Sequence, residues 1–222
     1  PFLSISASYA YACGVKTDRT LSCWEDDGVP APTEAPPSGQ FESVAVGPSF
    51  GCAIRSDGTV ACWGNDAEGQ TTPPSGRFTM LAAGHAHACG IQVGGTLTCW
   101  GSNDFGQLDA PEGTFTELAA AFSHACAIRS DQTIACWGTS SFGATANTPG
   151  GTFRSVTTGV EGSCGITTAG DVECWSTNSY AAPPPPAGIS FVQISAGIGP
   201  CGVTDRAELL CWGAWIHPLQ NR

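Results

Sequence analysis

One segment of about 38 residues, repeated six times, constrains the fold of this chain more than any other feature. The copies begin at Phe2, Phe41, Phe78, Phe115, Phe153 and Phe191, at spacings of 37 to 39 residues. Every copy carries two cysteines ten residues apart, and a tryptophan directly follows the second one. A fixed period in this range indicates one supersecondary unit stacked on copies of itself. The 222 residues therefore predict a single repeat domain, residues 1–222.

Each copy contains the pattern of three short strands. The first is an apolar segment that ends in small residues, such as LAAG at residues 81–84. Two segments with period-two alternation follow, as in Cys52 to Ile54 and Val60 to Cys62. If Cys52 faces Cys62 in a hairpin, three residues remain for the turn, and the last of them needs a left-handed backbone. The six copies place Arg19, Gly58, Gly95, Gln132, Gly170 and Arg206 at this turn position.

The twelve cysteines form equally spaced pairs with none left over. In the hairpin register both sulfurs of a pair point to one face of neighbouring strands, within disulfide reach. Zinc is the alternative, but zinc sites gather four ligands from closely spaced pairs, and no histidine accompanies each pair here. We therefore predict six disulfides, each inside one repeat, and an oxidising compartment. The predicted pairs are Cys13 with Cys23, Cys52 with Cys62, Cys89 with Cys99, Cys126 with Cys136, Cys164 with Cys174, and Cys201 with Cys211.

The tryptophans predict how the repeats are arranged. Each follows the second cysteine of its copy, so its ring points to the opposite face of the strand. A sheet that is apolar on both faces needs neighbours on both sides, which sheets arranged around a ring provide. We therefore expect an all-β, six-bladed β-propeller that closes on itself, with segment 214–222 completing or sealing the last blade. The Pro-rich segments between copies make any fourth strand short and peripheral.

Composition excludes several classes of function. The net charge is −11, and only 12% of the residues are charged. Without a basic stripe, the chain is not expected to bind nucleic acid. The longest apolar runs are far shorter than the roughly 20 residues that a membrane helix needs, so no membrane insertion is expected.

The repeat resembles a known superfamily. Its pattern is an F-x-x-(V/L/I)-A-A-G segment, then H-x-C-x-(I/V), D-G-T-V-x-C-W-G and N-x-x-x-G-Q, clearest at residues 41–70 and 78–108. This pattern is similar to the repeats of the regulator of chromosome condensation superfamily. The paired cysteines look more like its extracellular branch, which includes crinkly-type plant receptor kinase ectodomains and bacterial secreted repeat proteins. The resemblance implies a β-propeller of four-stranded blades and leaves activity open.

The sequence shows no recognisable combination of catalytic residues. His87 and His124 lie two residues before a cysteine, at a position occupied elsewhere by Tyr11 or Phe50, and we interpret them as structural rings bonded to nearby backbone. His85 and His217 are the other histidines, and no hydrolase or metalloprotease motif accompanies them. The acidic residues 25–27 lack the spacing of a calcium loop. We expect no enzyme, no cofactor and no metal site.

Aromatic residues in the loops are the candidate binding residues. Phe105, Phe142 and Tyr180 each lie six residues after the second cysteine of three consecutive copies, so their loops should share one face of the propeller. Each ring either anchors a partner or covers its own blade. Trp215 is a further candidate contact. The sequence therefore predicts a secreted or cell-surface, non-catalytic module for protein binding. Glycan binding and self-association in an extracellular filament or coat are the alternatives.

Overall fold

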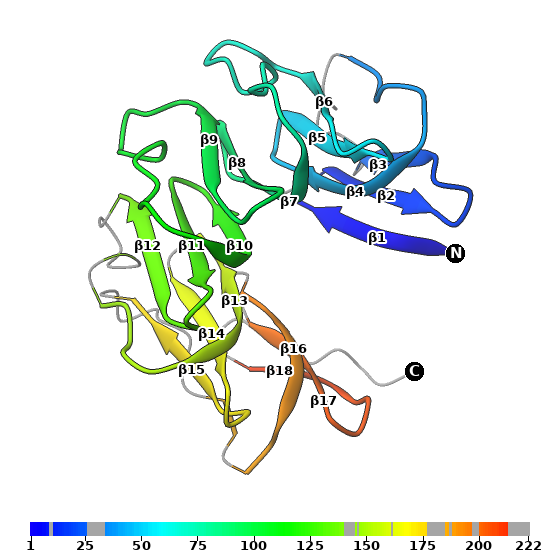
Figure 1. Ribbon diagram of the computed structural model, residues 1–222. Coiled ribbons are helices and arrows are strands. Elements are labelled where there is room, and N and C mark those ends of the chain that lie inside the picture. Colours follow the sequence, from blue (N-terminus) through cyan, green and yellow to red (C-terminus); the bar gives the residue numbers. More distant parts are fainter. Residues whose placement is uncertain are drawn as a thin grey trace.

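The computed structural model describes residues 1–8, 11–25, 34–139, 145, 147–160, 162–176, 185–186, 188–196 and 200–212. They form six antiparallel sheets of three strands each, here called blades one to six in chain order, which confirms the predicted all-β propeller (Figure 1). The strands are β1 (Phe2–Ala7), β2 (Tyr11–Lys16), β3 (Leu21–Glu25), β4 (Phe41–Val46), β5 (Phe50–Arg55), β6 (Val60–Gly64), β7 (Phe78–Ala83), β8 (His87–Gln92), β9 (Leu97–Gly101), β10 (Phe115–Ala121), β11 (His124–Arg129), β12 (Ile134–Gly138), β13 (Phe153–Thr158), β14 (Ser163–Thr167), β15 (Val172–Trp175), β16 (Phe191–Ser195), β17 (Cys201–Thr204) and β18 (Leu209–Cys211).

The hairpin register agrees with the prediction. In blade two Cys52 lies opposite Cys62, and Ile54 lies opposite Val60. All six predicted disulfides are present, one in each blade, with Cα–Cα distances of 3.9 to 4.1 Å. The disulfides thus pin the second and third strands of every blade together.

The first strand of every blade contains an irregularity that the sequence did not reveal. In blade two, Phe41 pairs with Arg55 but Ser43 already pairs with Ile54, so one extra residue is accommodated in β4. The same register shift occurs in the other five blades. A bulge of this kind bends the strand and turns the side chain beside it.

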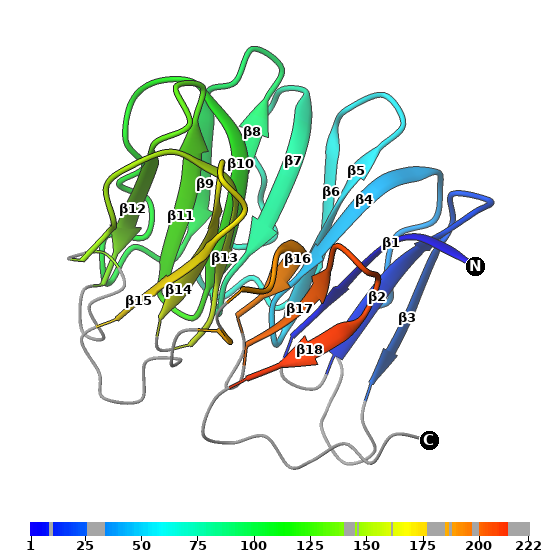
Figure 2. The ribbon, with the colours of Figure 1, turned by 90° about the horizontal axis from the view of Figure 1, so that it is seen from below.

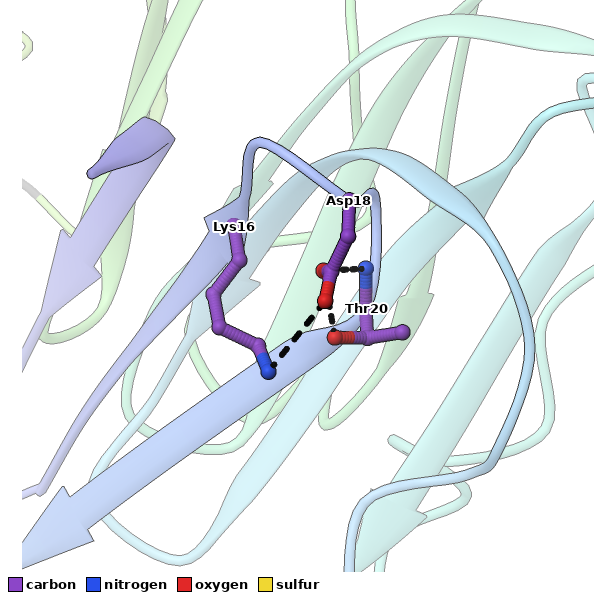
Figure 3. A network of polar contacts seen from close by, with 3 residues as sticks. All are labelled: Lys16, Asp18 and Thr20. Atoms are coloured by element: carbon purple, nitrogen blue, oxygen red, sulfur yellow. Dashed lines mark hydrogen bonds and ion pairs between the residues drawn. The ribbon is translucent and has the colours of Figure 1, made fainter.

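The hairpin turns repeat one hydrogen-bond pattern. The carboxylate of Asp18 accepts hydrogen bonds from the backbone N–H and the hydroxyl of Thr20, at 3.0 and 2.6 Å, and Lys16 Nζ lies 3.6 Å from it (Figure 3). Blades two and four repeat the Asp and Thr bonds. In the sixth blade the left-handed turn residue is Ala207, with φ of 61°, so the predicted Arg206 is wrong by one position. Ala207 lies six residues after Cys201, as Gly58 lies six residues after Cys52.

Consecutive blades pack through unlike faces. The face of blade two that carries Cys52 and Ile54 packs against the face of blade three that carries Phe78 and Trp100. Four further hydrophobic clusters join the other consecutive blades in the same way. Each blade thus presents sulfur and aliphatic carbon to its successor and aromatic rings to its predecessor, as the spacing of Cys and Trp predicts.

One expectation about the edges needs correction, and a second depends on residues outside the described ranges. The described sheets have three strands, not the four that the resemblance implies. The fully described connections 71–77 and 108–114 contain no strand, because their prolines lack the N–H that a ladder needs. No hydrophobic cluster joins described residues of blades one and six, so the expected closing contact is not part of the described structure. Segment 214–222, expected to seal it, lies outside the described residues. Within the described part, no helix is long and apolar enough to cross a bilayer.

Candidate protein-binding surface

The loop after β9 holds an exposed aromatic ring on a fixed backbone. Phe105 is 57% exposed, so its ring does not fold back to cover its own blade. Its backbone N–H donates to Gln107 Oε1 at 2.8 Å, and Gln107 itself is buried. The N–H of Leu108 donates to Asn103 Oδ1 at 2.8 Å. An exposed ring on a loop that is already ordered loses little conformational entropy on binding, which favours a role as an anchor.

Blade two builds the same loop with a different tip. Glu68 N–H donates to Gln70 Oε1 at 2.8 Å, and Gln70 is buried. The Gln70 carbonyl then accepts the Trp100 Nε1–H of the next blade at 3.0 Å. Gln70 and Gln107 were not among the predicted site residues, although the N-x-x-x-G-Q pattern contains them. Their role depends on a contact with the following blade, which the pattern alone does not show.

Turns between first and second strands add exposed apolar side chains at the same end of the sheets. His85 and Phe122 lie in two adjacent turns of this kind, with ring centroids 4.8 Å apart, and His85 N–H donates to the Phe122 carbonyl at 3.1 Å. Ser102, at the start of the Phe105 loop, donates its N–H to Ala86 O at 2.9 Å and so ties that loop to the same turn. Phe122 is 47% exposed. We call Phe105, Phe122, His85 and Val160, which is exposed in the equivalent turn of blade five, the loop-end surface.

The hairpin turns lie at the opposite end of the sheets. Figure 2 shows the hairpins, such as that between β5 and β6, on one side and the ends of β3, β15 and β18 on the other. The hairpins carry exposed carboxylates and the exposed Val93. The exposed rings of Phe105 and Phe122 lie at the loop end, away from the hairpins.

Part of the repeat region matches a known protein family. Residues 41–70 and 81–107 match the family described as Regulator of chromosome condensation (RCC1) repeat. Two copies of the repeat match the RCC1 repeat. The matched residues coincide with the two clearest copies, so the RCC1 match confirms the predicted resemblance. No curated protein sequence is significantly similar to the chain.

Solved structures share the fold of these RCC1 repeats. The CRINKLY WD40 ectodomain of the Arabidopsis thaliana receptor kinase ACR4 is 24% identical, with a TM-score of 0.82 over 97% of this chain and 82% of that one. The entire ectodomain of the Physcomitrella patens receptor kinase CR4 is also 24% identical, with a TM-score of 0.79 over 94% of this chain. This chain spans 61% of that ectodomain. Prp20p from Saccharomyces cerevisiae, described with its binding to Gsp1p and histones, is 13% identical, with a TM-score of 0.72 over 88% of this chain and 66% of Prp20p.

Three of the four predicted binding residues cannot be placed. Phe142, Tyr180 and Trp215 lie outside the described residues. The neighbourhood of Phe105 with Phe142 and Tyr180 therefore stays a prediction. Sequence reasoning missed Phe122 and Val160, although each lies four residues before the first cysteine of its copy, as His85 does.

The buried histidines serve packing, though not as predicted. His124 Nε2 lies 3.1 Å from Ser163 Oγ of the next blade, and no described residue hydrogen-bonds the ring nitrogens of His87. The expected bonds to nearby backbone are therefore wrong. The pKa of both rings is lowered to about 4, mainly by burial, and for His87 the neighbouring His124 and His85 contribute to this shift. Both rings are neutral near pH 7 and lie between blades.

Carboxylates do not converge in the described part of the chain. Burial raises the pKa of Glu117, but this side chain accepts the N–H of Val156 at 3.0 Å and so joins blade four to blade five. No group of three or more His, Cys, Asp or Glu side chains that could hold a metal ion occurs among the described residues. The described geometry thus offers an ordered apolar surface rather than a set of reacting groups.

Proposed function

We propose that this protein is an extracellular, non-catalytic propeller that binds a protein partner through the loop-end surface. The observation that carries the proposal is the exposed Phe105 ring on a loop held by the buried Gln107. Six disulfides support an oxidising, extracellular setting. The likeness to two plant receptor kinase ectodomains agrees with that setting, as a similarity of fold.

The chemistry of the surface favours a protein partner. Phe105 and Phe122 present two aromatic rings at the same end of adjacent blades, and aromatic anchors dominate protein interfaces. The Ser102 to Ala86 hydrogen bond ties the Phe105 loop to the turn of blade three. The His85 N–H to Phe122 carbonyl bond ties that turn to the turn of Phe122, so the two rings meet a partner as one preordered patch. Prp20p, which shares this fold, is described with its binding to Gsp1p and histones, and this supports a protein partner.

The test uses immobilised protein and proteins from the extracellular fraction of its native source. Wild type is compared with the double variant Phe105→Ala and Phe122→Ala. Val93→Ala is the matched control, because Val93 is 66% exposed on the opposite end of the sheets. A protein captured by wild type and control but lost with the double variant supports the proposal. Equal capture by all three forms contradicts it, and specific binding to a glycan array would assign the surface to sugars instead.

A further inference from the structure

The first blade leaves uncovered a face that the other blades bury. Phe2 is 43% exposed and Trp24 is 44% exposed, whereas the equivalent phenylalanines and tryptophans of the other five blades are 0 to 6% exposed. The two rings nevertheless lie together as in the internal blades, with centroids 5.6 Å apart. Ile5 is 59% exposed, while its equivalent Val44 is 7% exposed. We call Phe2, Ile5 and Trp24 the head face.

The last blade leaves the opposite kind of face uncovered. Leu209 lies opposite Val203 in the hairpin and is 68% exposed. It is the equivalent of Val60, which packs as a partly buried residue into the cluster between blades two and three. Cys201 and Cys211 are likewise only partly buried. We call Val203, Leu209 and this disulfide the tail face.

The head face and the tail face correspond to the two sides of an interface between consecutive blades. In all five observed interfaces a face of the tail kind covers a face of the head kind. The backbone matches as well. Phe41 N–H donates to the carbonyl of the left-handed turn residue Arg19 at 2.8 Å, and blades three to five repeat this bond. Ala207 provides the same turn in the tail blade, and Phe2 is the corresponding donor residue in the head blade.

The indole of Trp24 also lacks an acceptor. In blades two, three and four the equivalent Nε1–H donates to the preceding blade, as Trp63 does to Tyr11 Oη at 3.0 Å. No described residue accepts a hydrogen bond from Trp24. The head face thus has an unused donor where an internal blade meets its predecessor.

We propose that the head face binds the tail face of a second copy of this chain, so that copies associate head to tail. The internal interfaces identify the occupant, because a tail face is what covers every buried head face in this molecule. Burial of both apolar faces drives the association. The contact joins two different surfaces, so it generates a ring of copies or an open chain of copies. It is separate from the loop-end surface and stands independently of it.

Sedimentation at increasing protein concentration tests the proposal. Wild type should gain mass with concentration. Trp24→Glu and Leu209→Glu should each weaken self-association roughly hundredfold, because each buries an unpaired carboxylate in the contact. An equimolar mixture of the two variants should form a dimer, since each variant retains one intact face. Val93→Glu, at an exposed site on the hairpin end, should associate like wild type.

The mixture of the two variants distinguishes head-to-tail binding from other modes of self-association. Circular dichroism and thermal melting first confirm that each variant is folded. Wild type that stays monomeric at every concentration overturns the proposal. Closure within one copy, or cover of these faces by a different partner, would give that result. Self-association of either variant alone, or a mixture that stays monomeric, overturns it as well.

Discussion

The backbone carbonyl of Gln107 accepts a hydrogen bond from Trp137 Nε1 at 2.9 Å, across the boundary between blades three and four. The side chain of the same Gln107 accepts the N–H of Phe105. One buried residue therefore joins the packing of two blades to the conformation of the loop that carries the candidate anchor. The loop that carries Phe105 is thus ordered by its own Gln107 and is tied through this residue to the interface between two blades.

Gln107→Ala should loosen this loop without opening the blade interface. The variant keeps the carbonyl that Trp137 uses and loses only the acceptor of the Phe105 N–H. Loss of one hydrogen bond of about 1 kcal/mol predicts roughly fivefold faster hydrogen exchange at the Phe105 amide. Gln70→Ala is the matched control, because it should speed exchange at Glu68 and leave Phe105 unchanged. Unchanged exchange at Phe105 in Gln107→Ala would contradict this account of the loop.

Stability should fall as the pH is lowered from 7 to 4. The folded-state pKa of His87 and of His124 is about 4, below the ordinary value of 6.5. The unfolded chain therefore binds more protons over this range, and acid favours unfolding. Each histidine should lower the free energy of unfolding by about 3 kcal/mol between pH 7 and pH 4. Thermal midpoints measured across this range check the slope, and a midpoint that is flat from pH 7 to pH 4.5 would disagree with buried neutral rings.

His87→Phe should remove part of that pH dependence. Blade two has Phe50 at the equivalent position, fully buried, so an aromatic hydrocarbon fits this place in the repeat. The variant should be at least as stable as wild type at pH 5, because no buried ring nitrogen remains to be protonated there. Val93→Phe is the control, since it adds an exposed ring and removes no histidine, so the slope should stay that of wild type. Identical slopes for wild type and His87→Phe would refute the assignment.

Gly84→Ala should destabilise the fold. A Cβ at Gly84 would lie 2.2 Å from His87 Cε1 and 2.7 Å from the Ala121 carbonyl of the next blade. The backbone contact cannot be relieved by a rotamer change, so we expect a loss of about 1 to 3 kcal/mol in the free energy of unfolding. Gly150→Ala is the matched control, because nothing lies within 4 Å of its Cβ position. Chemical denaturation compares the two, and equal stabilities would show that the blades adjust freely.

Removal of a disulfide should cost more in the middle of the propeller than at its end. Replacing Cys52 and Cys62 by alanine removes a cross-link worth about 2 to 3 kcal/mol and also removes a fully buried sulfur from the interface with blade three. The same change at Cys201 and Cys211 removes a cross-link of equal loop length from a partly exposed face. Thermal midpoints should therefore fall further for the first pair. Equal losses would mean that burial of the sulfur contributes little.

The sequence alone determined the features that depend on neighbours along the chain. The ten-residue cysteine spacing predicted six hairpins and six disulfides, and alternation placed Trp63 and Cys62 on opposite faces. These predictions are correct because strand register and turn length are local properties. In the sixth blade the left-handed turn residue is Ala207, one position after the predicted Arg206, and it keeps the six-residue offset from the first cysteine.

Only the tertiary structure decided which of these faces are covered. Trp24 and Trp63 have the same place in the repeat, yet one ring is exposed and the other is buried, because burial depends on a preceding blade and not on the strand itself. The hydrogen bond from Trp137 Nε1 to the Gln107 carbonyl likewise joins residues of two different blades, and nothing in the local pattern of either residue shows it. Repetition specifies each unit, whereas the ends and the ordered loops are set by what packs against them.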